Sequence, residues 1–239
     1  MSLRSTYNYI RKRVAEIYYR LRHSVSIFRK RFPSIAVTGR IVLPSDFVLD
    51  EATAKPRGYQ APDGSYYSKV NQLSFEQLPR TVVESIRNYD SILRLYLGDG
   101  YLINDANIWR NYSIPVEIKN QELISNHWHY DKVVDFRNIQ LFVLLGDVSE
   151  DDGPLEFLIN PNEYRLMPSV LNRSNADLNI NSKKLTGKRG DTFLFSTGST
   201  PHRAGIPKDG HFRDIFSVAF FPAYTKIGKP AQLLLMDLN

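Results

Sequence analysis

Two stretches of the chain repeat hydrophobic side chains at three- and four-residue steps, which is typical of an amphipathic helix. The first stretch spans residues 1–33, places basic side chains between its apolar positions, and is closed by Pro33. The second stretch follows Ser74 and Gln77, whose spacing is that of a helix capping box, and stops at Gly98. The apolar stripe of this second predicted helix consists of Val82, Val83, Ile86, Tyr89, Leu93 and Leu97.

After residue 100 the pattern changes to short runs of aromatic and branched side chains, separated by turns. Such runs are typical of strands, and several of them at short spacing indicate a sandwich or a jelly roll. By contrast, residues 34–73 are mixed and residues 161–190 show no clear periodicity, so we expect irregular structure there. The expected strands are 101–103, 106–114, 127–131, 138–148, 155–159, 191–195 and 212–221.

Composition narrows the protein class. The chain has 239 residues and no cysteine, which excludes a disulfide scaffold, a thiolate zinc site, an iron–sulfur cluster and a cysteine nucleophile. It has no apolar run of the length that spans a membrane and no apolar core of a secretory signal. We therefore expect a cytoplasmic protein with one main domain.

Charge is concentrated at the start of the chain. Residues 1–31 hold nine basic side chains and one acidic one, whereas the remainder holds 22 basic and 24 acidic side chains. The excess of basic side chains therefore lies in residues 1–31, called the leader below. The remainder, called the body, is not expected to bind nucleic acid. We divide the chain into a basic amphipathic helix over 1–33 and a domain over 34–239. The helix either packs on the body or contacts an anionic membrane surface or a partner.

Two histidines and one aspartate could together form an iron site. His129 and Asp131 are two residues apart in a predicted strand, so both point to the same face. His202 follows the predicted strand that ends at Phe195. Two histidines and one carboxylate form the facial triad of non-haem iron(II) oxygenases, which leaves three coordination positions open.

The last predicted strand adds an anion-binding candidate. Arg213 and Ser217 point to one face of this strand. An arginine can bind a carboxylate with two parallel hydrogen bonds, and a serine hydroxyl can add a donor. These groups would suit the distal carboxylate of 2-oxoglutarate, and Gln140, on another predicted strand, is a further candidate for contact with this co-substrate.

The ordered set of motifs resembles the phytanoyl-CoA dioxygenase family. The resemblance runs over about residues 100–222 and rests on His129-x-Asp131, the Gly-Pro-Leu turn at 153–155, the run that begins Gly190-Asp-Thr-Phe, and then His202 and Arg213. It departs from the family at Ile159-Asn-Pro-Asn-Glu, where many relatives carry Pro-Gly-Ser-His. It departs again at Ala204, where some relatives place serine or asparagine.

The resemblance implies a mainly β fold with flanking helices, namely a double-stranded β-helix (a cupin-like jelly roll). It also implies that Fe(II) binds to the triad and that 2-oxoglutarate is held by Arg213. The expected activity is O2-dependent hydroxylation of an unactivated carbon in a small molecule, with release of succinate and CO2. Because related halogenases have a small residue in place of the carboxylate, Asp131 argues against halogenation. Candidate substrate contacts are Trp109, Asn111 and His127.

Two other classes stay open. A jelly roll could bind a small acid or sugar without turning it over, in which case metal content and succinate formation would be absent. Alternatively, the basic leader could be the active part and deliver the body to an anionic surface. The sequence does not identify the substrate.

Overall fold

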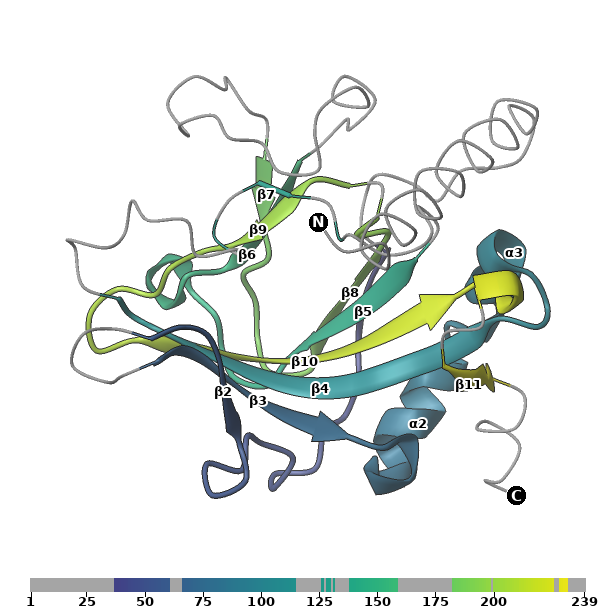
Figure 1. The fold of residues 1–239 in the computed structure, drawn as a ribbon, viewed down its shortest axis with the longest axis horizontal. Coiled ribbons are helices and arrows are strands. Elements are labelled where there is room, and N and C mark those ends of the chain that lie inside the picture. Colours follow the sequence, from purple (N-terminus) through teal and green to yellow (C-terminus); the bar gives the residue numbers. More distant parts are fainter. Residues whose placement is uncertain are drawn as a thin grey trace, which may run out of the picture.

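The computed structural model describes residues 37–60, 66–114, 126, 128–129, 131, 138–158, 182–198, 200–225 and 228–231. Two antiparallel sheets face each other, with two helices against the outer side of the larger sheet (Figure 1). The helices are α2 (Arg80–Arg87) and α3 (Asp90–Leu97), and the 3-10 turns are η1 (Phe75–Gln77), η3 (Glu150–Asp152) and η6 (Ala223–Thr225). The strands are β1 (Val37–Arg40), β2 (Lys55–Gln60), β3 (Tyr66–Leu73), β4 (Leu102–Tyr112), β5 (Ile139–Leu144), β6 (Leu155–Leu158), β7 (Ser182–Lys184), β8 (Asp191–Phe195), β9 (His202–Ala204), β10 (Phe212–Phe221) and β11 (Lys229–Pro230).

The strand order confirms the predicted architecture, which is mainly β with flanking helices. The large sheet runs β1-β8-β5-β10-β4-β3-β2, with β11 paired to β4, and the small sheet runs β7-β6-β9. From β5 to β10 the chain passes back and forth between the two sheets, with β5 in the large sheet, β6 and β7 in the small one, β8 in the large, β9 in the small and β10 in the large, which is the winding of a jelly roll. No helix in the described ranges is long and apolar enough to cross a membrane.

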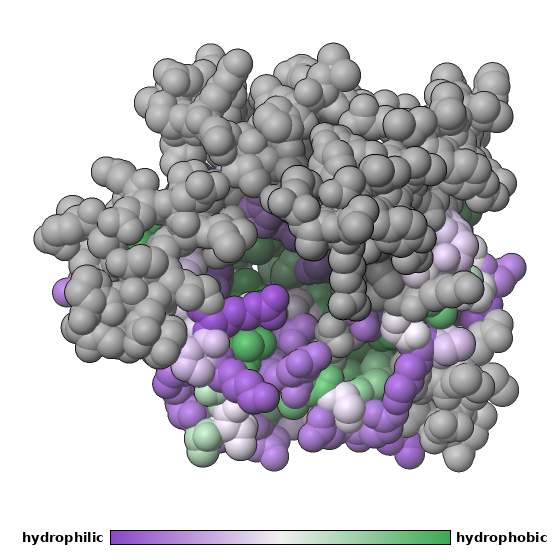
Figure 2. Space-filling model, in the orientation of Figure 1, coloured by the Kyte–Doolittle hydropathy of each residue, from purple (hydrophilic) through white to green (hydrophobic). Residues whose placement is uncertain are grey.

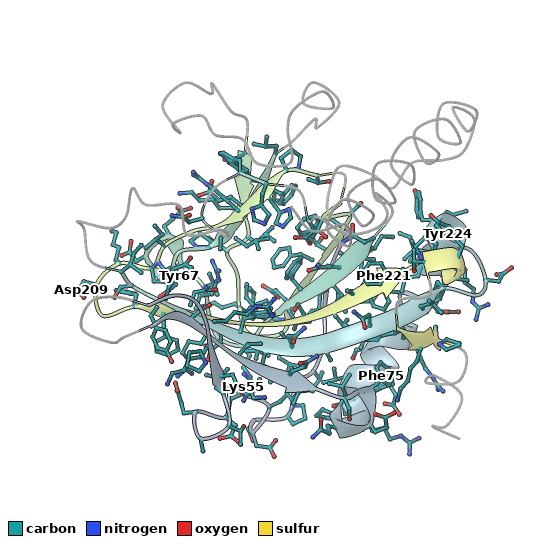
Figure 3. All side chains as sticks on the ribbon, in the orientation of Figure 1. Lys55, Tyr67, Phe75, Asp209, Phe221 and Tyr224 are labelled. Carbon is teal, nitrogen blue, oxygen red and sulfur yellow. The ribbon has the colours of Figure 1, made fainter. Side chains whose placement is uncertain are left out.

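Each face of the large sheet packs against a different hydrophobic core. Between the two sheets, Phe142 and Ile215 of the large sheet pack with Phe157 of the small one. On the opposite face, Phe216 packs with residues of both helices, such as Val82 and Leu93. Side chains fill the space between the sheets, where the labelled Tyr67 lies and donates a hydrogen bond from its hydroxyl to the Gly205 carbonyl at 3.3 Å (Figure 3). The alternation along β10 therefore separates an inner face, toward the small sheet, from an outer face.

The predicted single helix after Ser74 is wrong in one respect, because the structure divides it. The capping box forms as expected, with Ser74 N–H donating to Gln77 Oε1 at 2.7 Å, but it caps the short turn η1. The two α-helices then meet at Asn88 and Tyr89. Asparagine has a low helix propensity, and the Tyr89 hydroxyl is hydrogen-bonded to Thr192 on β8 at 2.5 Å, so the chain turns there to keep both helices on the sheet.

Several strands lie where irregular structure was predicted. Residues 34–73 contain β1, β2 and β3, and residues 161–190 contain β7. β1, β2 and β7 are at sheet edges and expose polar side chains, whereas β3 buries polar ones such as Ser68 and Asn71, so none of these sequences shows a hydrophobic alternation. The expected strands 101–103 and 106–114 are one strand, β4, with a register shift against β10 at Val218 and Ala219. The predicted leader helix, residues 1–33, lies outside the described residues.

Candidate metal centre

The small sheet and its neighbouring loop bring the three predicted ligands together. His202 begins β9, and His129 pairs with it through two backbone hydrogen bonds, N–H to carbonyl in each direction, both 3.0 Å long. The backbone of Asp131 is held by a different segment: its N–H donates to the carbonyl of Thr197, just after β8, at 3.1 Å. Three separate parts of the chain therefore position the candidate site through backbone bonds, which leaves all three side chains available.

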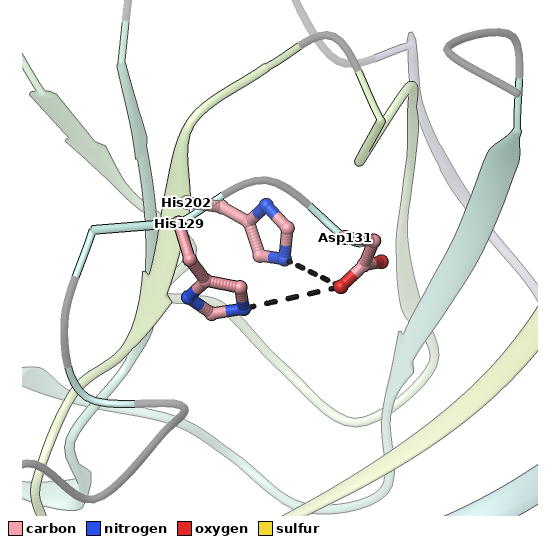
Figure 4. Close-up of side chains that lie close together, drawn as sticks. All are labelled: His129, Asp131 and His202. Atoms are coloured by element: carbon pink, nitrogen blue, oxygen red, sulfur yellow. Dashed lines mark ion pairs between the residues drawn. The ribbon is translucent and has the colours of Figure 1, made fainter. Parts of the chain in front are cut away.

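The three side chains converge on one point (Figure 4). Asp131 Oδ1 lies 3.6 Å from His202 Nε2 and 3.9 Å from His129 Nε2. One ligand atom from each residue lies within 4.8 Å of the other two. His202 is buried, whereas His129 and Asp131 are partly exposed, so the group is open on one side. Within the described ranges this is the one group of three or more such side chains with metal-binding spacing.

The hydrogen bond on the far side of His202 sets its tautomer. Its Nδ1 lies 3.0 Å from the Thr200 carbonyl oxygen, which can only accept a hydrogen bond. Nδ1 therefore carries the proton, and in the neutral ring the lone pair is on Nε2, the atom nearest Asp131. A histidine that binds a metal is commonly oriented by such a bond from its second nitrogen.

Charge at the site favours an ionised carboxylate. Burial raises the pKa of Asp131, but the positive charge of a protonated His202 3.6 Å away, with a smaller effect of His129, holds it well below its usual range. Burial lowers the pKa of His202, yet the Asp131 carboxylate outweighs this and raises it. A carboxylate that stays anionic beside two imidazoles is a donor set suited to a divalent transition metal.

A second group of polar side chains holds Asp131 in place. Gln140, on the inner face of β5, donates from Nε2 to Asp131 Oδ2 at 2.8 Å. Asn138 donates from Nδ2 to the Thr197 hydroxyl at 2.8 Å, and both residues are fully buried. The structure thus places Gln140, a predicted co-substrate contact, against the carboxylate ligand. Sequence reasoning missed Asn138 and Thr197, because no motif marks a buried polar pair.

Arg213 is a buried cation with unused hydrogen-bond donors. Its exposed fraction is 2%, and Nη2 donates to Asn111 Oδ1 at 2.8 Å. Nε and Nη1 have no hydrogen-bond partner among the described residues, and burial lowers the pKa of the guanidinium. Leaving such donors unpaired in the interior is costly. A bound anion would satisfy them, so the residue fits the predicted carboxylate clamp.

The remaining predicted residues are placed as follows. Trp109 donates from Nε1 to Ser217 Oγ at 3.1 Å, so these two side chains share the inner face. Asn111 faces Arg213 across the β4–β10 pair. His127 lies outside the described residues. The structure therefore brings together His129, Asp131, His202 and Gln140 in one group, and Arg213, Asn111, Trp109 and Ser217 along the neighbouring strands.

Comparison with known proteins supports the fold. No family model and no curated protein matches the chain. Among solved structures, it is similar to the non-heme alpha ketoglutarate dependent epimerase SnoN from nogalamycin biosynthesis, with a TM-score of 0.52, 13% identity, and coverage of 82% of this chain and 81% of that one. It is also similar to the carbocyclase SnoK from the same biosynthesis, with a TM-score of 0.51, 12% identity, and coverage of 72% and 70%. At this identity the likeness establishes the jelly-roll fold, and the resemblance to the phytanoyl-CoA dioxygenase family stays a prediction.

Proposed function

We propose that the protein is a non-haem Fe(II)- and 2-oxoglutarate-dependent dioxygenase that hydroxylates an unactivated carbon of a small organic molecule. The observation that carries the proposal is the convergence of His129, Asp131 and His202 within 4.8 Å in a jelly roll. Three protein ligands on one side of a metal leave room for a two-point co-substrate and for dioxygen. The bond between His202 Nδ1 and the Thr200 carbonyl leaves Nε2 as the metal-binding nitrogen, and Asp131 is held in its ionised form.

The unsatisfied guanidinium supports the choice of co-substrate. Arg213 is on the inner face of β10, is 2% exposed and has two nitrogens without a partner in the described part of the chain. The distal carboxylate of 2-oxoglutarate would pair with these donors, and Asn111 would fix the third nitrogen in place. SnoN and SnoK, which share the fold, are alpha ketoglutarate dependent enzymes.

The chain's own residues would act mainly by binding and orientation. When bound, Fe(II) with 2-oxoglutarate supplies the O2-dependent oxidation, which yields succinate and CO2. His129, Asp131 and His202 hold the metal, Gln140 orients the carboxylate ligand, and Arg213 fixes the far end of the co-substrate. The packed aromatic core beside His202, which includes Phe195 at a ring distance of 5.9 Å, keeps water away from its inner side.

Hydroxylation is the expected outcome among those open to such a site. SnoN is an epimerase and SnoK a carbocyclase, so one fold accommodates several outcomes. Related halogenases have a small residue where this chain has Asp131, so the carboxylate argues against halogenation. The product of a turnover assay, rather than the fold, distinguishes the remaining outcomes.

The test is formation of succinate from 2-oxoglutarate in the presence of Fe(II) and O2. We expect succinate from the wild type, increased by a substrate, and none from His129→Ala, Asp131→Ala or His202→Ala. Far-ultraviolet circular dichroism should show that these variants keep the fold. A protein that binds small acids or sugars but yields no succinate would instead be a non-catalytic binding module.

A further inference from the structure

One arginine of the inner face stacks on a predicted substrate residue. Arg57, on the edge strand β2, places its guanidinium carbon 4.7 Å from the centre of the Trp109 ring. Arg57 is exposed, whereas Trp109 is partly buried and fixed by its hydrogen bond to Ser217. An arginine stacked on a rigid indole is oriented by the ring face, and the edge of its planar guanidinium stays free to bind.

Comparable stacks elsewhere in the described chain have a carboxylate partner, and this one does not. Arg203 stacks on Trp128 at the same distance of 4.7 Å and pairs with Glu156 at 2.9 Å. A further stack, Arg110 on Phe212, is balanced by Asp214 at 2.6 Å. Among the described residues Arg57 makes no ion pair. Of these three stacked arginines, it is therefore the one that has no acidic partner.

The register of the large sheet places Arg57 on the same surface as the proposed co-substrate clamp. Arg57 pairs with Ser68, Ser68 with Asn111, and Asn111 with Arg213, so the four residues form one row across β2, β3, β4 and β10. Residues paired in this way point to the same face of a sheet. Arg213 is the buried end of this row and Arg57 is its exposed end.

The same surface leads from Arg57 to the candidate metal centre. Trp109 contacts Ser217, which pairs with Phe142, and Phe142 is two residues from Gln140 on the same face of β5. Gln140 in turn contacts Asp131. Figure 2 shows a hollow near the centre of this view, with hydrophobic residues visible inside it and hydrophilic ones below it. Arg57 and the candidate metal centre are thus connected along the inner face of the large sheet.

We propose that Arg57, held on Trp109, recognises an acidic group of the substrate, so that the substrate is a carboxylate or phosphate monoester rather than a neutral molecule. The inference deepens the proposed function and rests on it. The substrate's anion would pair with the free edge of the guanidinium, its apolar part would lie along Trp109, and the carbon to be oxidised would point to the metal. Arg213 is not available for this role when 2-oxoglutarate occupies it.

Matched acid and neutral probes test the proposal without turnover. Protein loaded anaerobically with Fe(II) and saturating 2-oxoglutarate, so that Arg213 is occupied, is titrated with hexanoate against hexanamide and with hexyl phosphate against 1-hexanol. Binding is followed by the fluorescence of the two tryptophans, one of which is Trp109. The variants are Arg57→Gln and Arg57→Lys, with Arg80→Gln as the control, since Arg80 is exposed on α2 and pairs with Glu84.

We expect at least one acid to bind the wild type about tenfold more tightly than its neutral partner, as a charge-assisted hydrogen bond would provide. Arg57→Gln should bring acid and neutral probe to equal affinity, Arg57→Lys should keep part of the preference, and Arg80→Gln should keep all of it. A preference for hexanoate or for hexyl phosphate identifies which acid the substrate carries.

Equal binding of acid and neutral probes to the wild type, or an acid preference that survives Arg57→Gln, would overturn the anion site. The visible band of the iron–co-substrate complex in the same samples reports separately on the proposed function. A band with no acid preference refutes the anion site alone. An absent band refutes the proposed function, and the acid preference then still decides whether Arg57 binds anions.

Discussion

At the scale of single residues, the candidate site combines two kinds of buried polar group. His202 and Asp131 satisfy each other in part and are also oriented by the Thr200 carbonyl and Gln140. Arg213 differs, because two of its nitrogens have no partner among the described residues. Interiors rarely tolerate such a charge without a counter-ion. We therefore propose that Arg213 forms an ion pair with a bound ligand.

Replacing Arg213 tests that interpretation. Arg213→Ala should weaken binding of 2-oxoglutarate by about 2–5 kcal/mol, since the carboxylate would be left buried and unpaired. Arg213→Lys should be intermediate, because an ammonium keeps the charge but loses the two-point geometry. The measurement is calorimetric titration of 2-oxoglutarate into the metal-loaded protein. Arg110→Ala is the matched control, since Arg110 pairs with Asp214 on the opposite face of the same strands. Equal affinities for wild type and both Arg213 variants would contradict the clamp.

Gln140 should control the metal through Asp131. Gln140→Leu keeps the size of the side chain but removes the donor to Oδ2, so the carboxylate would lose its fixed orientation. Loss of such supporting bonds typically lowers metal affinity about 10–100-fold. Anaerobic Fe(II) titration measures this effect, with Gln77→Leu in the capping box as a control remote from the site. An unchanged affinity for Gln140→Leu would mean that this hydrogen bond does not orient the ligand.

At the scale of elements, the sequence pattern predicted strand bounds correctly where hydrophobic side chains run through the whole strand. β10 and β8 have the predicted bounds, because buried and branched side chains run through both. The pattern failed at β2, whose Lys55, Pro56 and Arg57 are exposed at a sheet edge. The helix after Ser74 was predicted as one unit, because the contact between Tyr89 and Thr192 that accompanies its division joins residues far apart in sequence.

The candidate site shows the same division. His129, Asp131, His202 and Arg213 could be predicted as site residues from their types and spacing, and their order resembles a family pattern. The contacts of Gln140 with Asp131 and of Asn111 with Arg213 could not, since both depend on how the strands pair. The stack of Arg57 on Trp109 likewise requires β2, which the sequence did not predict. Residue types can therefore indicate the ligands, whereas the groups that support them follow only from sheet register.

The start of β8 depends on a glycine that other residues cannot replace. Gly190 has φ of +89°, and a β-carbon there would lie 2.4 Å from the Ile41 carbonyl oxygen, which belongs to the segment after β1. Gly190→Ala should lower the free energy of unfolding by about 1–3 kcal/mol or more, because strain and a backbone clash combine. Urea unfolding measures the loss. Gly210→Ala is the control, since φ there is +76° but the space is open, and an equal loss in both variants would exclude the clash.

At the scale of the whole molecule, charge separates the leader from the body. Residues 1–31 carry nine basic side chains and one acidic one, whereas the remainder is slightly acidic. The candidate site and the fold that positions it lie within residues 37–231. Turnover of a free small substrate should therefore depend on the body, and the leader should affect where the protein binds rather than what it catalyses.

The leader should confer binding to anionic vesicles. Each basic residue near such a surface contributes about 1 kcal/mol, and salt screens the attraction. Co-sedimentation with phosphatidylserine vesicles should therefore be strong at low salt, weak at high salt, and lost on deletion of residues 1–31, while succinate formation persists. Absence of co-sedimentation at low salt would contradict membrane binding and favour a helix that packs on the body.

The anaerobic difference spectrum of the protein with Fe(II), before and after addition of 2-oxoglutarate, tests the central claim most directly. A co-substrate that binds the metal through two oxygens should produce a weak visible charge-transfer band that requires both components. We predict this band for the wild type and its loss in His129→Ala, Asp131→Ala and His202→Ala. No band in the wild type, or a band of wild-type intensity in any of the three variants, would contradict the assignment of these residues as the iron site of a 2-oxoglutarate-dependent enzyme.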